Sequence, residues 1–179
     1  MVGKSDQFQL VQDIGALLGD TKTSDIVIQC QEKKFHCHRI ILGARSLVFR
    51  RMFDTDMKEA SSGVITVNDI DVEAVEAMIE FIYTDGVTKD VEDTAMLLYA
   101  ADKYELKGLL EICFRKFKDG MDDDQLVEIL ILSERHSLAD FKSIAMKKIM
   151  ADKAKFINDK DFQKKMEKHP QLLFELFKI

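Results

Sequence analysis

Histidine and cysteine stand side by side at His36-Cys37-His38, and these are side chains that commonly bind zinc in proteins. The surrounding residues predict a β-strand, on which successive side chains point to opposite faces. Only His36 and His38 could therefore point toward the same ion. No Cys-x-x-Cys pair elsewhere in the sequence completes a tetrahedral set, so we predict no metal site and no cofactor.

A run of carboxylates, Asp122-Asp123-Asp124, is the other cluster that could do chemistry. A calcium loop needs oxygen ligands at wider spacing and a glycine at its sharp turn, which this run lacks. Acidic side chains at the start of a helix complement the helix dipole, and we assign them that role. The sequence also lacks a glycine-rich phosphate loop, a Gly-x-Ser-x-Gly motif and a Ser/His/Asp arrangement at motif spacing. We therefore predict that the chain is not an enzyme.

The composition is typical of a globular protein, since 46% of the 179 residues are apolar and 32% are charged. The net charge of -6 argues against nucleic acid as a partner, because phosphate groups need a clustered positive surface. No apolar run approaches the roughly 20 residues that a membrane-spanning helix needs, so we expect no membrane partner. The three cysteines lie in apolar runs, which favours reduced thiols in an intracellular protein of the nucleus or the cytoplasm.

Apolar residues at three- and four-residue intervals predict a first helix that ends at Gly19-Asp20. Short apolar runs predict strands at 24–28, from Phe35 onward and at 64–67. Ser46 can cap a helix over 47–53, because its hydroxyl can accept a hydrogen bond from an early backbone amide. Further helices are predicted around 72–82, as a pair within 93–118, around 126–132 and 141–149, and after Pro170.

The order of these elements, and several short motifs within them, resemble the BTB/POZ family. The matching blocks are Ser24–Ile28, Phe35–Leu42, Ala44–Phe53, Met57–Glu59, Phe81–Gly86 and Ala95–Leu106. The resemblance implies an α+β fold over residues 8–118, with a small sheet flanked by helices and a long N-terminal dimerisation helix. Residues 121–179 resemble the all-helical three-box or BACK-like extension of speckle-type POZ proteins, which are MATH-BTB adaptors of cullin-3.

In the BTB fold the first helix packs across a two-fold axis against a second copy, so the resemblance implies a homodimer. The residues that match the dimer positions are Leu10, Ile14, Leu17 and Leu18. The same apolar stripe could instead pack on its own domain. Asp25 and Arg39 look like the family's charged pocket near the dimer interface. An acid and a base at the start of neighbouring elements also fix their geometry, and we favour that structural role.

Met57-Lys58-Glu59 matches the hydrophobic-x-glutamate motif with which BTB adaptors bind cullin-3. A methionine among charged residues suits a partner pocket, where its burial could contribute about 1.5–3 kcal/mol. Met57 could also be an ordinary exposed apolar residue without a function, since single apolar residues are common on protein surfaces. The family resemblance favours the role in partner binding. The residues that the resemblance places at the borders of the same groove are Phe53, Asp54, Tyr83 and Thr84.

By this resemblance the chain is a non-catalytic homodimeric adaptor that binds the N-terminal domain of cullin-3 and recruits substrates to a cullin-RING E3 ubiquitin ligase. Substrate proteins would bind through a module outside these residues, such as a MATH or kelch domain. The alternative is the BTB dimerisation module of a transcriptional regulator, which recruits a corepressor. In the last helix, Leu173 and Phe177 are candidates for a second self-association that could link dimers into higher oligomers.

Overall fold

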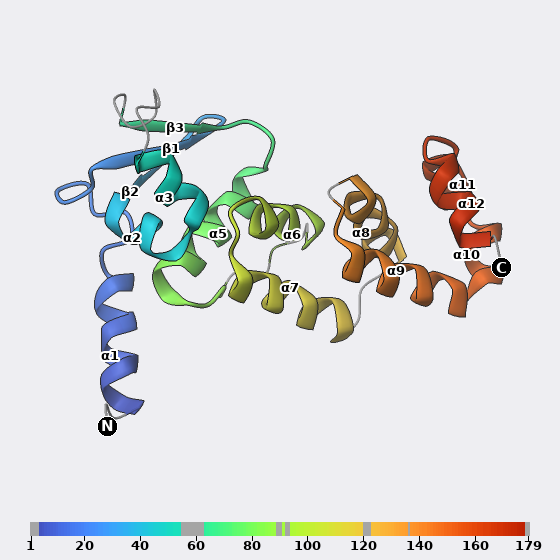
Figure 1. Ribbon diagram of the computed structural model, residues 1–179, viewed down its shortest axis with the longest axis horizontal. Coiled ribbons are helices and arrows are strands. Elements are labelled where there is room, and N and C mark those ends of the chain that lie inside the picture. Colours follow the sequence, from blue (N-terminus) through green and yellow to red (C-terminus); the bar gives the residue numbers. More distant parts are fainter. Residues whose placement is uncertain are drawn as a thin grey trace. The chain divides into compact units, whose positions relative to one another are not determined.

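The computed structural model describes residues 4–54, 63–88, 91, 94–119, 123–135 and 137–177 (Figure 1). The chain divides into two compact units, Met1–Cys113 and Phe114–Ile179. The first unit combines a small sheet with helices, and the described residues of the second unit form helices. The predicted α+β fold class is therefore confirmed. The predicted boundary between a BTB domain and its extension, at residues 118–121, stays a prediction.

A three-stranded sheet in the order β2-β1-β3 forms one layer of the first unit (Figure 1). β1 (Ile26–Cys30) pairs antiparallel with β2 (Lys33–Cys37) and parallel with β3 (Val64–Val67). A parallel pair needs a long crossover connection rather than a hairpin. The helices α2 (Arg39–Arg45) and α3 (Leu47–Asp54) lie within that connection.

The inner face of the sheet is built by alternate residues. Ile26, Ile28 and Cys30 of β1 are at most 2% exposed, whereas the residues between them are half-buried. The register places Ile28 beside Ile65 and Cys30 beside Val67, so β3 continues the same apolar face. A shift of one residue would turn this whole face toward solvent, and burial therefore fixes the register.

The central helix of the first unit is α5 (Val72–Thr84). Its first turn is capped by the side chain of Asp71, which accepts a hydrogen bond from the amide of Ala74 at 2.6 Å. It ends at Asp85, which adopts the left-handed conformation with φ 59°. The buried residues of α5 surround most of the helix and are Ala74, Val75, Ala77, Met78, Ile79, Phe81, Ile82 and Tyr83.

Two further helices, α6 (Thr94–Lys103) and α7 (Lys107–Asp119), follow with a tight turn between them. Glu105 makes this turn with φ 52°. Gly108 lies against the ring of Phe81, because a Cβ at position 108 would stand 2.9 Å from the Cζ atom of that ring. The glycine therefore allows the start of α7 to approach α5 closely.

The N-terminal helix α1 (Lys4–Gly15) is shorter than predicted, and in Figure 1 it projects away from the sheet. Leu17 and Leu18 donate hydrogen bonds to the carbonyl groups three residues earlier, at 3.1 Å each. This tighter bonding pattern ends the regular helix, so the prediction that the helix continues to Gly19 is wrong by about one turn. A Cβ at Gly15 would lie 3.2 Å from a methyl group of Thr84, so the end of α1 rests on α5.

The second unit consists of a pair of longer helices and three short ones. Their bounds are α8 (Asp123–Arg135), α9 (Ala139–Ala151), α10 (Lys153–Asn158), α11 (Lys160–Glu167) and α12 (Pro170–Phe177). The sequence predicted α8, α9 and α12, whereas α10 and α11 were not predicted. Phe156 of α10 and Phe162 of α11 meet edge to face at 5.5 Å between ring centroids, and both are buried.

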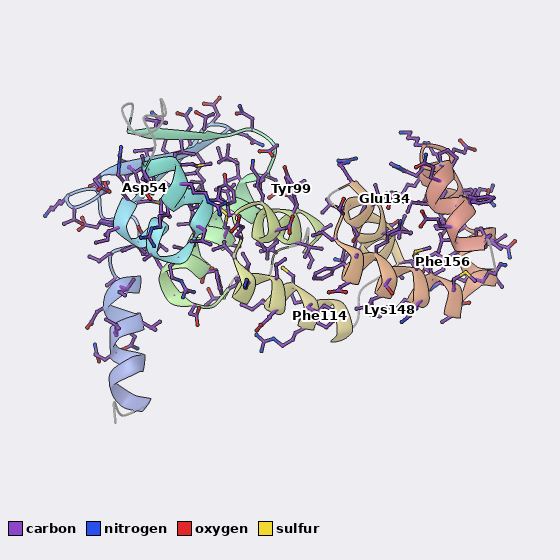
Figure 2. The ribbon with its side chains drawn as sticks, in the orientation of Figure 1. Asp54, Tyr99, Phe114, Glu134, Lys148 and Phe156 are labelled. Atoms are coloured by element: carbon purple, nitrogen blue, oxygen red, sulfur yellow. The ribbon has the colours of Figure 1, made fainter. Side chains whose placement is uncertain are left out.

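Ion pairs join the helices of the second unit at its surface. Lys142 of α9 lies 2.5 Å from Glu134 of α8 and 2.7 Å from Glu175 of α12. Figure 2 labels Glu134 and also Phe156, which marks the position of α10. The hydrogen bonds that Lys142 donates to Glu134 and Glu175 raise the pKa of its ammonium group. Because these pairs are partly exposed, apolar burial contributes more to the stability of the unit.

Candidate interaction site

The helix α3 is fixed to the first unit at its N-terminus by Ser46. The hydroxyl of Ser46 accepts a hydrogen bond from the amide of Phe49 at 3.2 Å and donates one to the carbonyl of Tyr104 at 2.7 Å. The ring of Phe49 stacks on that of Tyr104 at 4.5 Å between centroids. The predicted cap is confirmed, and it holds one face of α3 against the core. The opposite face, which begins with Leu47 at 53% exposure, is left to solvent.

A surface hollow of about 420 Å³, which we call the α2–α3 hollow, lies beside that exposed face. The residues that line the hollow are Arg39, Ile40, Gly43, Ala44, Arg50, Phe53 and Asp54. Ile40 is 81% exposed, and the guanidinium of Arg39 covers the ring of Phe53 at 5.4 Å. Arg50 and Asp54 stand 3.9 Å apart on α3, and Figure 2 labels Asp54 at the end of that helix. The hollow thus has apolar surface with charged groups around it, which suits contact with another protein.

The structure brings together some of the residues predicted to bind cullin-3. Phe53 and Asp54 line the α2–α3 hollow, whereas Thr84 lines a different cavity. Tyr83 is only 2% exposed, and its hydroxyl hydrogen bonds with the amide of His38 at 2.8 Å and with Nδ1 of the same residue at 2.9 Å. Burial raises the pKa of the Tyr83 hydroxyl. Tyr83 therefore holds the start of α2 in place and offers little surface to a partner.

The predicted motif Met57-Lys58-Glu59 lies outside the described residues. The sequence places it directly after α3, three residues beyond Asp54. A partner that covers the α2–α3 hollow would therefore have this motif within reach along the chain. Its part in binding stays a prediction.

Asp25 and Arg39 meet at the start of α2. The carboxylate of Asp25 accepts a hydrogen bond from the backbone amide of Arg39 at 2.8 Å, and the Arg39 side chain donates to the carbonyl of Asp25 at 3.4 Å. A carboxylate on an unpaired amide of the first turn stabilises the start of a helix. Both contacts use a backbone group of the other residue, and the part of this pair in a charged pocket stays a prediction.

The residues predicted to form the dimer interface keep much of their surface open. Leu10 is 60% exposed and Leu18 is 37% exposed, while Ile14 and Leu17 are half-buried. A helix of 12 residues is marginally stable in water unless it packs against something. An apolar face that remains open on such a helix is therefore a candidate for contact with another chain.

Sequence reasoning missed the exposure of Ile40 and Leu47. Both residues stand in apolar runs that look like core segments. The helical phase of α2, which starts after His38, puts Leu42 into the core and turns Ile40 outward. A helix that starts at Arg39 has this phase, so the helix start was the signal in the sequence for the exposure of Ile40.

The last helix exposes one residue of the predicted pair, Leu173, and one residue that was not predicted, Phe174. Leu173 is 37% exposed and its neighbour Phe174 is 65% exposed. The ring of Phe177 is half-buried and lies 4.7 Å from the ammonium nitrogen of Lys153. Leu173 and Phe174 are therefore the residues of α12 that offer the most apolar surface.

The histidines of the first unit have partners within the protein. His36 lies 3.4 Å from the hydroxyl of Ser24, and His38 lies 2.9 Å from that of Thr23. Among the residues that the structure describes, no group of three histidine, cysteine or acidic side chains could hold a metal ion. Within the same residues, no helix has the length and apolar character needed to cross a membrane.

The cysteines Cys30, Cys37 and Cys113 are all buried, and none forms a disulfide within the described part of the chain. Burial raises the pKa of the Cys37 thiol to about 12, although a hydrogen bond with Tyr83 acts in the opposite direction. Burial also raises the pKa of Cys30, whose sulfur lies 3.3 Å from the carbonyl of Ile70. A thiol with a raised pKa is a poor nucleophile, so Cys30 and Cys37 act as core residues.

The fold and the exposed surfaces define a module that binds other proteins, and comparison with known sequences identifies its family. A profile of the BTB/POZ domain matches residues 15–120, which is more than half of the chain. The chain belongs to the BTB/POZ family. Domains of this family self-associate and bind other proteins, and they are typically non-catalytic.

Curated relatives include one that matches the chain along nearly all of its length. The chain is 30% identical to mouse "TD and POZ domain-containing protein 3" over 177 residues, which cover 97% of this chain and 48% of that protein. The chain thus spans about half the length of this relative. Among solved structures, the BTB domain of zebrafish PATZ1 shares the fold, with a TM-score of 0.56 and 18% identity, over 67% of this chain and 98% of that domain.

Proposed function

We propose that the chain is a non-catalytic homodimeric adaptor that binds cullin-3 and recruits substrates to a cullin-RING E3 ubiquitin ligase. The observation that carries this proposal is the α2–α3 hollow. Its apolar residues Ile40 and Phe53 stand beside the charged groups of Arg50 and Asp54, at the end of α3 that leads into the Met57-Lys58-Glu59 motif. The resemblance to cullin-3 adaptors assigns the same part of the chain to the cullin.

Burial of apolar side chains at this surface could supply much of the binding free energy. Complete burial of a side chain such as Ile40, which is 81% exposed, contributes about 1.5–3 kcal/mol. Burial of Met57 would add a similar amount. Interfaces commonly obtain most of their affinity from a few such residues surrounded by polar groups. A cullin helix seated in the α2–α3 hollow would bury Ile40.

Dimerisation gives this proposal its mechanism. A homodimer formed through Leu10, Ile14, Leu17 and Leu18 would present two cullin sites and two substrate-binding modules. The adaptor would act by proximity, because a substrate held near the ubiquitin-charged enzyme reacts at a raised effective concentration. In this proposal the substrate-binding module lies outside these residues. The ligase complex would act inside the cell. We also assign the second unit to the three-box type of extension, in which it would widen the cullin contact.

The proposal is tested by titrating the N-terminal domain of cullin-3 with the wild-type chain and with two variants, Ile40→Asp and Met57→Asp. We expect each variant to weaken binding by about tenfold or more, because each places a charge in an apolar contact. The matched control is Ile157→Asp, which puts the same charge on an exposed isoleucine of α10 and should bind normally.

The mass of each variant in solution separates the possible outcomes. A variant that remains a dimer and loses cullin binding agrees with the proposal. Normal cullin binding by both Ile40→Asp and Met57→Asp would contradict it. Absence of cullin binding in the wild-type chain, together with binding of a corepressor peptide, would favour the transcriptional alternative.

A further inference from the structure

A second cavity of the first unit, of about 470 Å³, lies between the edge strand β2 and the helix α5, and we call it the β2-edge slot. Its volume falls within the range of roughly 300–1,000 Å³ found for ligand sites in proteins. Leu18, Phe35 and Ile79 provide apolar walls, and Glu76 and Glu80 of α5 provide carboxylates. The slot is lined by a different set of residues from the α2–α3 hollow.

Glu80 is the unusual residue of this slot. Its Oε1 accepts hydrogen bonds from the amide of Thr88 at 3.1 Å and from the Thr88 hydroxyl. Its Oε2 is buried and has no hydrogen-bond partner among the described residues. A buried carboxylate oxygen without a partner is costly, so a donor is needed at this position. The contacts with Thr88 hold the carboxylate in a fixed orientation.

The neighbouring charges leave Glu80 as the acid that still needs a cation. Glu76 already pairs with Lys33 at 2.7 Å, and that ammonium also lies 5.2 Å from the ring of Phe35. Lys34 also lines the slot, but among the described residues it forms no ion pair with Glu80. A basic group that enters the slot would therefore meet Glu80, with apolar walls around the stem of its side chain.

The open edge of the sheet supplies the second element of recognition. The strand order β2-β1-β3 places β2 at the edge of the described sheet, and four consecutive residues, 33–36, line the slot. An extended peptide can add to such an edge through backbone hydrogen bonds, while alternate side chains enter pockets beside it. Every second side chain of the added peptide would point toward α5 and into the slot.

We infer that the β2-edge slot binds an extended segment of a partner protein, which adds to β2 and places one arginine or lysine side chain against Glu80. This site is additional to the cullin surface, and it does not rest on cullin binding. It would supply a second, sequence-selective contact on each copy of the chain. Arginine fits this site well, since its planar group can donate to a carboxylate while its stem packs on apolar walls.

The inference is tested with a synthetic peptide, Thr-Val-Arg-Val-Thr, blocked at both ends and titrated into isotope-labelled protein. We expect amide shifts at Lys33–His36 and on α5 near Glu80. The variant Glu80→Gln should weaken binding by about tenfold, which corresponds to about 1.4 kcal/mol. The matched control is Glu73→Gln, an exposed glutamate of the same helix that does not line the slot.

A second peptide, with norleucine in place of arginine, tests the charge without changing the protein. On the wild-type chain, the norleucine peptide should bind about tenfold more weakly than the arginine peptide. On the Glu80→Gln variant, the two peptides should bind with equal affinity. Equal binding of the two peptides to the wild-type chain, or shifts confined to residues away from β2, would overturn the inference. Glu80→Gln could instead change the oligomeric mass of the protein in the absence of peptide. That result would show that a second copy of the chain occupies the slot, and it would also overturn the inference.

Discussion

The hydroxyl of Ser46 donates a hydrogen bond to the carbonyl of Tyr104, 2.7 Å away, and so ties the start of α3 to the end of α6. The same hydroxyl caps α3, because it accepts from the amide of Phe49. Two segments that are far apart in the sequence are joined at one atom that is almost completely buried. The orientation of α3, and with it the α2–α3 hollow, depends on this contact.

We predict that Ser46→Ala lowers the free energy of unfolding by about 1–3 kcal/mol, because it removes a helix cap and leaves a buried carbonyl without its donor. Urea unfolding followed by circular dichroism measures the change. The control is Ser143→Ala, on the exposed side of α9, which should change stability by less than about 0.5 kcal/mol. Equal effects of the two substitutions would show that the Ser46 contact contributes little.

We predict that Leu10→Asp converts the dimer into a monomer without unfolding the first unit. Leu10 is 60% exposed within its own chain, so the substitution removes contacts with a second copy and few within the first. Sedimentation velocity gives the mass. Gln12→Asp introduces the same charge at an exposed position of α1 away from the apolar stripe, and it should remain a dimer. A dimeric Leu10→Asp would remove α1 from the interface.

We predict that stability falls as the pH rises from about 9 toward 12. The folded chain keeps the Cys37 thiol protonated, because burial raises the pKa of that thiol to about 12 from its ordinary value of 9.0. The unfolded chain loses this proton above pH 9, so alkaline conditions favour unfolding. Urea midpoints measured from pH 8 to about 10.5 test this direction. Cys37→Ala should flatten the decline, and an unchanged slope would assign it to other groups, such as the buried tyrosines.

We predict that the second unit carries a weaker self-association through Leu173 and Phe174 of α12. These residues are 37% and 65% exposed, so they offer more apolar surface than the half-buried Phe177. Phe174→Ser should reduce the growth of mean mass with concentration, as measured by light scattering, and leave the α1 dimer intact. Growth identical to that of the wild-type chain would exclude this surface.

Local signals in the sequence were sufficient for much of the fold. The short apolar run at 24–28 predicted the first strand, which the structure shows at Ile26–Cys30, and Ser46 predicted the start of α3. The helices α10 and α11, of six and eight residues, were not predicted, whereas α12, also of eight residues, was predicted because it begins at Pro170. Helices of this length are stabilised by tertiary contacts such as that between Phe156 and Phe162, which a local pattern does not reveal.

The candidate site was harder to predict than the fold. Phe53 and Asp54 were assigned to a partner surface from the family resemblance, and both line the α2–α3 hollow. Tyr83 was assigned to the same surface, yet it is buried against His38, a residue 45 positions away in the sequence. A contact over that separation depends on how β2, α2 and α5 pack, which motif spacing does not contain. The exposure of Ile40 was missed for a different reason, because it follows from the local helical phase of α2.

Hydrogen exchange of the chain with and without the N-terminal domain of cullin-3 tests the central claim most directly. The account predicts slower exchange in α2, α3 and the segment that carries Met57-Lys58-Glu59 when the cullin domain is added. Unchanged exchange over these residues, at a cullin concentration that saturates binding, would contradict the assignment of the α2–α3 hollow as the cullin-binding surface.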